Sequence, residues 1–285
     1  MPESPLLPER DQPSSELAEA PSLTVEQAIA QLTDPDLSLR YYAAWWLGKF
    51  RVTDPAAVTA LIAALEDDSD RTELGGYPLR RNAARALGKL DDRRAVPGLV
   101  RCLSCDDFYV REAAAQSLGM LGDASCVPEL LKLLVGGLAA AQPVPGRPHL
   151  AQPVEAVVEA VGALAPQTPW EAEAIERVRP LLNHSLRRVQ YAAARAMYQL
   201  TREAIYGDRL VQALSDPDVN LRRVALSDLG AVGYLPAAEA IATAAAENSF
   251  KLFSLKGLLE QQIYPEELQL STAAVQLIEL MDSLL

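Results

Sequence analysis

The hydrophobic and polar positions of the chain repeat in a nine-residue pattern, in which an arginine is followed by two small residues, a leucine and a glycine. The small residues stand three and four positions after the arginine, and the leucine and glycine stand seven and eight positions after it. The positions up to the leucine share one face of an α-helix. Clear copies begin at Arg40, Arg80, Arg111 and Arg222, and degenerate copies begin at Val154 and Gln190.

A second apolar segment lies between successive copies, as in 56–67, 94–103, 126–134 and 236–247. Several of these segments have a proline near their start, which suits the first turn of a helix. The copies begin 31 to 43 residues apart, so each unit is long enough for a pair of helices. The sequence therefore predicts an all-α fold, a HEAT-like right-handed α-solenoid of about six helix-pair repeats.

The points where this pattern begins and ends divide the chain into three predicted parts. Residues 1–22 are rich in Pro, Glu and Ser without a helical period, which predicts a disordered tail. Residues 23–258 form the repeat array, and 259–285 form a C-terminal extension with an apolar helix around Ala273 to Leu284. Two stretches interrupt the rhythm of the array, 66–79 and the Gly/Pro-rich insertion 135–153. Irregular segments of that length are often functional or disordered.

The arginines of the pattern are predicted to form a structural ladder. Three of them follow an aspartate by four residues, at a position suited to cap the N-terminus of the helix. Each arginine is expected to reach the loop of the neighbouring repeat. The residues of this ladder are Asp36, Arg40, Arg80, Asp107, Arg111, Asp218 and Arg222.

Composition excludes several classes of function. The net charge of −12 disfavours nucleic-acid binding, and no apolar run is long enough to insert into a membrane. The three cysteines, Cys102, Cys105 and Cys126, are too few for a disulfide framework, which suits a cytoplasmic protein. His149 and His184 lie far apart, so neither a metal site nor a catalytic triad is indicated. The spacing of Cys102 and Cys105 is interpreted as incidental, with one at a helix end and one in a loop.

The first copy of the pattern is unusually aromatic. It contains Tyr41, Tyr42, Trp45 and Trp46, although the chain has three tryptophans in all. One interpretation is that Tyr41, Ala44 and Trp45 pack inward. The four rings cannot all face one side of a helix, however, so the other interpretation is an aromatic wall on the concave surface.

The second copy carries a basic cluster. Arg80 occupies the ladder position, but Arg81 and Arg85 share a different helix face and are suited to bind a carboxylate. A basic face beside an aromatic one fits a flat, apolar ligand with two carboxylates.

Long segments of the chain, irregular loops included, closely resemble the CpcE-type subunit of the heterodimeric E/F phycobilin lyases. The resemblance extends over roughly 23–258, and its most specific segments are 37–52, 75–99, 136–164, 189–200 and 233–252. It implies an enzyme that acts with an F-type partner to attach phycocyanobilin to a cysteine of the phycocyanin α subunit, and also to remove or transfer it. The nucleophile would then belong to the substrate protein. Phycocyanobilin would be a substrate, and no permanently bound cofactor is expected.

Given this resemblance, the hypothesis is that the aromatic and basic residues bind the pigment. No catalytic residue is assigned. The residues of this hypothesis are Tyr41, Tyr42, Trp45, Trp46, Tyr77, Arg81 and Arg85. Tyr77 belongs to the Gly-Gly-Tyr-Pro segment ahead of Arg80. Two alternatives remain at this point. One is a lyase–isomerase subunit of the phycoerythrocyanin type, and the other is a non-catalytic HEAT adaptor in phycobilisome assembly or turnover, as in NblB-type proteins.

Overall fold

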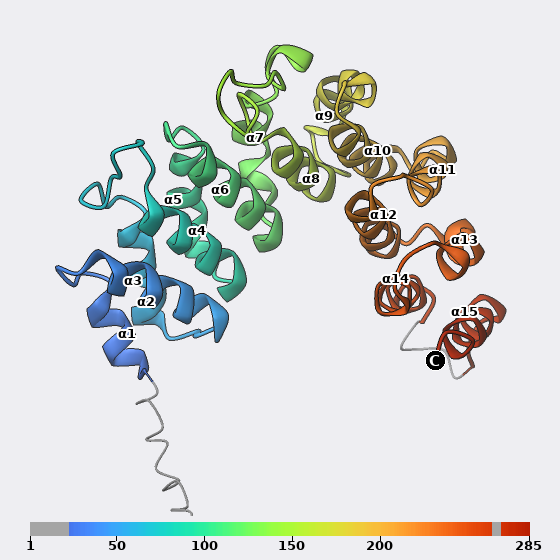
Figure 1. The fold of residues 1–285 in the computed structure, drawn as a ribbon, viewed down its shortest axis with the longest axis horizontal. Coiled ribbons are helices and arrows are strands. Elements are labelled where there is room, and N and C mark those ends of the chain that lie inside the picture. The colour runs from blue at the N-terminus through green and yellow to red at the C-terminus, as the bar shows by residue number, and fades with distance from the viewer. Residues whose placement is uncertain (1–22, 264–268) are drawn as a thin grey trace, which may run out of the picture.

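The computed structural model describes residues 23–263 and 269–285, and the tail predicted over 1–22 lies outside the described residues. Helices stack in pairs into an open arch, with one series of helices on the inside and one on the outside (Figure 1). The described residues contain no β-strand beyond one isolated bridge, Pro143 to Leu150. The predicted all-α solenoid is therefore confirmed.

The inner helices α2 to α12 carry the repeat pattern, and the outer helices α3 to α11 are the segments between its copies. The inner series is α2 (Leu37–Lys49), α4 (Pro78–Leu90), α6 (Phe108–Leu121), α8 (Val154–Leu164), α10 (Arg187–Thr201), α12 (Val219–Val232) and α14 (Asn248–Glu260). The outer series is α1 (Val25–Gln31), α3 (Pro55–Ala64), α5 (Val96–Cys102), α7 (Val127–Lys132), α9 (Glu171–Val178), α11 (Ala204–Ala213) and α13 (Ala238–Thr243). Short 3₁₀ turns precede or follow several of these, at Arg93–Ala95, Ala124–Cys126, Gly137–Ala139, Arg179–Asn183 and Leu235–Ala237.

Six of the described pairs carry the pattern or a degenerate form of it, and a seventh pair, α13 with α14, follows them. The helix expected around Ala273 to Leu284 is α15 (Thr272–Asp282), and it packs against α13 and α14.

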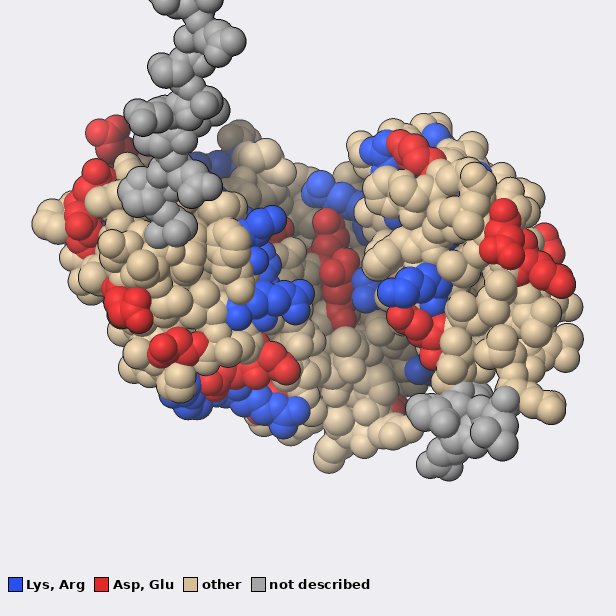
Figure 2. All heavy atoms as spheres, turned by 90° about the horizontal axis from the view of Figure 1, so that it is seen from below, with Lys and Arg blue, Asp and Glu red and all other residues tan. Residues whose placement is uncertain are grey.

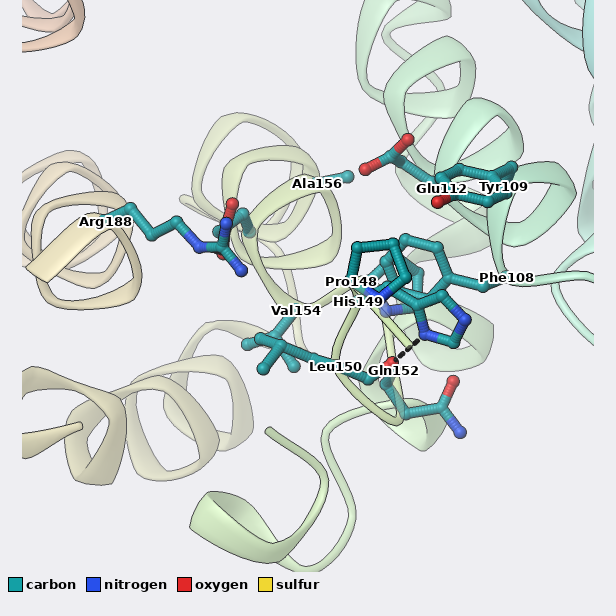
Figure 3. Close-up of a pocket in the computed structure, with 12 residues that line it drawn as sticks. Phe108, Tyr109, Glu112, Pro148, His149, Leu150, Gln152, Val154, Ala156 and Arg188 are labelled. Atoms are coloured by element: carbon teal, nitrogen blue, oxygen red, sulfur yellow. Dashed lines mark hydrogen bonds and ion pairs between the residues drawn. The ribbon is translucent and has the colours of Figure 1, made fainter. Parts of the chain in front are cut away.

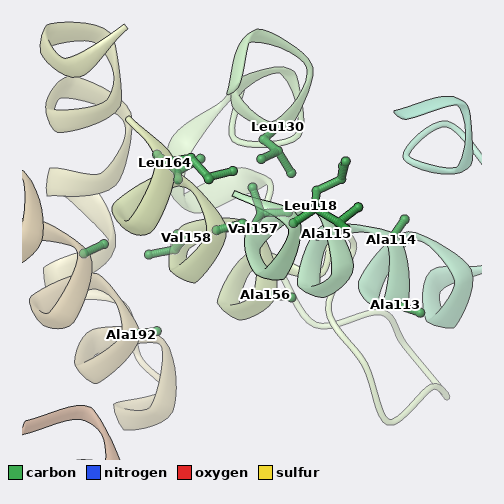
Figure 4. Close-up of a cluster of buried hydrophobic side chains, with 14 of the residues drawn as sticks. Ala113, Ala114, Ala115, Leu118, Leu130, Ala156, Val157, Val158, Leu164 and Ala192 are labelled. Carbon is green, nitrogen blue, oxygen red and sulfur yellow. The ribbon is translucent and has the colours of Figure 1, made fainter. Parts of the chain in front are cut away.

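The core is a continuous layer of small and aliphatic side chains between the two series. Figure 4 shows a section of it, in which Leu118 of α6, Leu130 of α7 and Val157 of α8 meet. The two positions three and four residues after the arginine are buried in every copy, as at Ala83 and Ala84, because they face the layer between the two series.

The pattern glycines set the distance between successive inner helices. A Cβ added to Gly48 would lie 2.7 Å from Cα of Ala86, and one added to Gly162 would lie 2.7 Å from Cα of Ala196. Gly88, Gly119 and Gly230 meet the equivalent residue of the next helix, Ser117, Ala160 and Ser254.

The junction between α10 and α12 departs from this rule. Tyr198 stands at the glycine position of α10, and Asp228 stands where α4, α6, α8, α10 and α14 have alanine or serine. Arg195 of α10 pairs with Asp228 at 2.8 Å, and both side chains are largely buried. At this junction the inner helices are therefore joined by an ion pair instead of by backbone contact.

The ladder residues bind loops along one edge of the arch. Asp36, Asp107 and Asp218 each accept a hydrogen bond at the N-terminus of their helix. Arg111 donates to the carbonyl of Cys105 in its own loop and to that of Ala151 in the next one, at 2.7 and 3.0 Å. Arg222 makes the same two kinds of bond, to Asp216 and Ala245, and Arg40 reaches Asp67. Arg80 donates to its own loop, at Glu66, Asp67 and Asp68, and it also lies beside the Cys105 side chain of the next loop.

The insertion 135–153 has a defined conformation. Its bridge is supported by a backbone hydrogen bond from Val144 to the carbonyl of His149 at 3.2 Å. His184 is buried, and its Nε2 donates to the carbonyl of Ala141 at 3.0 Å while its Nδ1 accepts from the amide of Leu186. His184 and Arg111 thus tie the insertion to α10 and α6.

Candidate functional site

The concave face is lined by the same two positions of every inner helix, one and five residues after the arginine position. An inner helix contacts an outer helix and its inner neighbours, which leaves only this side free. None of the side chains at these positions is buried in α2 to α12. We call the two sets the concave rows. The first row is Tyr41, Arg81, Glu112, Glu155, Tyr191 and Arg223, and the second is Trp45, Arg85, Gln116, Glu159, Arg195 and Ser227.

Four residues of the predicted pigment site therefore lie next to one another, Tyr41 and Trp45 on α2 and Arg81 and Arg85 on α4. Trp45 is 48% exposed, and its ring centroid lies 5.6 Å from that of Tyr42, which is 49% exposed. The interpretation in which Tyr41, Ala44 and Trp45 all pack inward is wrong for Trp45, whereas Ala44 is buried and Tyr41 packs partly against the core.

Two other residues of the predicted site, Trp46 and Tyr77, pack against the protein interior. Trp46, rather than Trp45, is the tryptophan that packs against the core, and its ring lies 4.9 Å from that of Phe50. Tyr77 is buried, with the guanidinium of Arg80 at 4.4 Å from its ring centroid. The predicted role of Tyr77 in binding pigment is therefore not supported, because its ring is not available to a ligand.

The two arginines of the predicted site differ in their contacts: Arg85 lies near a carboxylate, and Arg81 does not form an ion pair with a described residue. Arg85 lies 3.9 Å from a carboxylate oxygen of Glu112, on the next helix. Arg81 forms no ion pair with a described residue, and its Nε is buried without a hydrogen-bond partner among them. A buried guanidinium donor without an acceptor is costly. Arg81 therefore has no ion-pair partner among the described residues that would compete with an incoming carboxylate for its guanidinium group.

An acidic column occupies the middle of the concave face. Figure 2 looks into that face, where acidic residues run between groups of basic ones. Glu112, Glu155 and Glu159 form this column on α6 and α8. Burial raises the pKa of all three carboxyls, and for Glu155 and Glu159 the neighbouring carboxylates add to the effect. The arginines around them oppose the shift but do not cancel it. These carboxyls can therefore hold protons at a higher pH than free glutamate does.

A cavity opens beside Glu112 and Glu155 of this column (Figure 3). Its empty volume is about 460 Å³, and its lining combines Glu112, Glu155 and Arg188 with the rings of Phe108 and His149. Arg188 pairs with Glu155 at 2.9 Å. We call it the inner cavity. It offers a flat aromatic wall, a cation and two carboxyls to one ligand.

The structure gives the thiols no catalytic role. Cys102 ends α5 and Cys105 lies in the following loop, as predicted. Burial raises the pKa of Cys102 and of Cys126 to about 12, and it raises that of Cys105 as well. A thiol that stays protonated is a poor nucleophile. Among the described residues no group of three or more His, Cys, Asp or Glu is placed to hold a metal ion.

The sequence reasoning missed the acidic column, although a signal for it was present. Arg81 and Arg85 stand out because they are four residues apart on one face. The same two offsets in the following copies give Glu112 with Gln116 and Glu155 with Glu159. Extending the offsets across the repeats would have found the column. His149 had no such signal, because it lies in the insertion.

Comparison with known proteins agrees with this picture. The family described as HEAT repeats matches residues 77–142, and the family described as PBS lyase HEAT-like repeat matches 39–67. The phycocyanobilin lyase subunit alpha of Nostoc sp. PCC 7120 is 65% identical over 267 residues, which is 93% of this chain and 95% of the relative. The chain belongs to the phycocyanobilin lyase alpha-subunit family. A relative from Thermosynechococcus vestitus is 63% identical, over 87% of this chain and 90% of that relative.

A solved structure of this family matches over the whole length. It is the complex of CpcE and CpcF of phycocyanin lyase from Nostoc sp. PCC 7120, with a TM-score of 0.86, 61% identity and 100% coverage of both chains. The bilin biosynthesis protein PecE of the same organism is 44% identical, over 85% of this chain and 89% of its own. None of the described helices is both long and apolar enough to cross a lipid bilayer.

Proposed function

We propose that this chain, with an F-type partner, attaches phycocyanobilin through a thioether to a cysteine of the phycocyanin α subunit, and also removes or transfers it. The observation that carries the proposal is the full-length match, at 61% identity, to CpcE in its complex with CpcF. A scaffold without chemistry would share the repeats of this family. It would have no reason to share the irregular insertion as well.

The concave rows suggest how the pigment is held. A tetrapyrrole carries two propionates and a flat conjugated system. Arg81 and Arg85 suit the propionates, because a guanidinium binds a carboxylate through two parallel hydrogen bonds. Tyr41, Trp45 and the exposed ring of Tyr42 suit stacking on a pyrrole ring.

The acidic column suits the nitrogen atoms of the pigment. A carboxyl with a raised pKa both donates a proton and stabilises a protonated pyrrole nitrogen as its own charge returns. Glu112, Glu155 and Glu159 lie next to the arginines on the concave face, so one extended ligand reaches both groups. Positioning and proton transfer would then be the contributions of this chain, and the acceptor protein would supply the nucleophile.

Sequence identity favours a lyase over a lyase–isomerase. The relatives named as phycocyanobilin lyase alpha subunits reach 65% identity, whereas PecE reaches 44%. We therefore infer attachment without isomerisation. The three free cysteines suit the reducing cytoplasm.

Co-expression tests this proposal. This chain, an F-type partner and the phycocyanin α subunit are produced together in a host that makes phycocyanobilin, and covalent pigment is read on the denatured α subunit. Pigment should require both lyase chains. Equal labelling without this chain would contradict the proposal, and an absorption maximum typical of phycoviolobilin would indicate the isomerising type.

Arg81→Ala should raise the KM for pigment about tenfold and leave kcat within about a factor of two, because an ionic hydrogen bond contributes roughly 1.5–3 kcal/mol. The measurement is the initial rate of attachment against pigment concentration. Arg93→Ala is the matched control, since Arg93 is exposed and lies outside the concave rows. Equal effects of the two variants would remove Arg81 from the pigment site.

Trp45→Ala and Trp46→Ala should separate binding from folding. Trp45 is half exposed, so its loss should weaken pigment binding and change the free energy of unfolding by less than about 0.5 kcal/mol. Trp46 packs on the core, and its loss should destabilise the protein by about 2 kcal/mol. Urea denaturation and pigment titration distinguish the two results. The reverse pattern would place Trp45 in the core.

A further inference from the structure

His149 is held by its neighbours in a single orientation. It lies at the end of the insertion, and its ring stacks on Phe108 at 4.4 Å between centroids and 11° between planes. Tyr109 contacts the same ring edge-on, at 5.9 Å. Two aromatic rings of α6 therefore fix the plane of the imidazole.

The hydrogen bond of His149 fixes its tautomer. Nδ1 lies 2.8 Å from the carbonyl oxygen of Leu150, and this oxygen can only accept, so Nδ1 carries a hydrogen (Figure 3). The neutral ring then has its lone pair on Nε2. Nε2 makes no hydrogen bond with a described residue, and it is not among the buried polar atoms that lack a partner. It is therefore an accessible proton acceptor.

The wall formed by Phe108 and His149 separates two cavities. On one side is the inner cavity, with Glu112, Glu155 and Arg188. On the other side is a second cavity, which we call the loop cavity. Its lining comes from three loop regions at the edge of the arch and from α6. Besides the shared wall, it includes Thr72, Gly76, Asp106, Asp107, Arg111 and Arg147. A pigment on the concave face and a protein segment at the edge would meet at His149.

We propose that Nε2 of His149 is the general base that takes the proton from the acceptor cysteine as its sulfur attacks the pigment. This inference rests on the proposed lyase function and assigns that reaction a catalytic residue. The acceptor thiol is mostly protonated near neutral pH, and only the thiolate is a strong nucleophile. The chain offers no reactive thiol of its own, and the other histidine, His184, has both nitrogens engaged.

The step balances as an addition across the ethylidene double bond of the pigment. The sulfur forms a bond to the outer carbon while its proton passes to Nε2. The π electrons of the double bond form a new C–H bond at the ring carbon, with a proton supplied by a carboxyl of the acidic column. The imidazolium afterwards returns its proton to that carboxylate through water. No oxidant or reductant is consumed.

The test uses the complete system of this chain, its F-type partner, phycocyanobilin and the phycocyanin α subunit. Initial rates of thioether formation are measured from pH 6.5 to 9 for wild type, His149→Gln and the control Gln142→Ala, which lies on the same insertion outside both cavities. At pH 7 the His149→Gln rate should fall about 10²-fold, within the usual contribution of general base catalysis. At pH 9, where a free thiol is mostly ionised, the deficit should shrink to less than about tenfold.

Two further measurements distinguish a base from a structural residue. At saturating pigment the rate deficit of His149→Gln should persist, and co-purification with the partner should be unchanged. Imidazole added to His149→Ala should restore part of the rate. A deficit of the same size at every pH, or one that saturating pigment removes, would overturn the proposal, as would a wild-type rate. If the wild-type system attaches no pigment at all, the proposed function fails instead.

Discussion

Gly162→Val is expected to lower the free energy of unfolding by about 3 kcal/mol or more, because added volume at a closely packed helix contact forces the backbone apart. A Cβ at Gly162 would lie 2.7 Å from the Cα and Cβ atoms of Ala196 and 2.7 Å from Oε1 of Gln199. The first two of these atoms cannot move without moving α10. The two inner helices would have to separate, and the layers on both sides would lose contact with them.

Urea denaturation followed by circular dichroism measures this effect, and the chain contains a matched control. Gly119 stands at the same position of the pattern, but a Cβ there would lie 3.2 Å from Ala160. Gly119→Ala should be nearly neutral, because the small repulsion is offset by the better helix propensity of alanine, about 1 kcal/mol. Similar denaturation midpoints for Gly162→Val and wild type would show that the inner helices can separate at little cost.

Asp228→Asn is expected to make the protein more stable than wild type at pH 8 and to have little effect at pH 5. Burial raises the pKa of Asp228 to about 7, against the opposing effect of Arg195. The folded state therefore holds a proton that the unfolded state has lost. The resulting stabilisation is complete below about pH 4 and is lost as the pH rises through about 7. Asparagine keeps an oxygen for Arg195 and does not ionise.

The expected difference in unfolding free energy between Asp228→Asn and wild type grows by on the order of 2 kcal/mol between pH 5 and pH 8. The carboxyls of the acidic column are present in both proteins, so the column adds to this difference only through the coupling between Glu159 and Asp228. Glu176→Gln is the control for replacing a carboxyl by an amide, since Glu176 is exposed on α9 and forms no ion pair with a described residue. A difference that does not change with pH would show that Asp228 is already ionised at pH 5.

Local periodicity was enough to predict the repeat fold, because each copy of the pattern is complete within one helix. The same offsets that mark Ala83 and Ala84 as core residues also mark Arg81 and Arg85 as accessible. Tyr77 could not be judged in this way. Its burial depends on Arg80 folding back over its ring, which is a tertiary contact.

The site residues outside the pattern were beyond sequence reasoning for a related reason. His149 meets Phe108 and Leu150 only because the insertion folds back through its own bridge. The raised pKa values in the acidic column depend on three carboxyls, one on α6 and two on α8. The copies of the pattern on these two helices begin 43 residues apart, at 111 and 154. The offsets of the pattern do not place His149, and they place the carboxyls of the column without giving the burial that raises their pKa.

The junction between α10 and α12 also bears on how the array loses its structure. In a solenoid each repeat is stabilised by its neighbours, so the weakest interface sets the boundary between cooperative units. Five of the described interfaces between inner helices have a glycine of one helix against an alanine or serine of the next, and this one has Tyr198 and Asp228 at those positions. The segment from α12 to α15 would thus exchange its amide hydrogens as a separate unit, ahead of the segment that carries the pigment site.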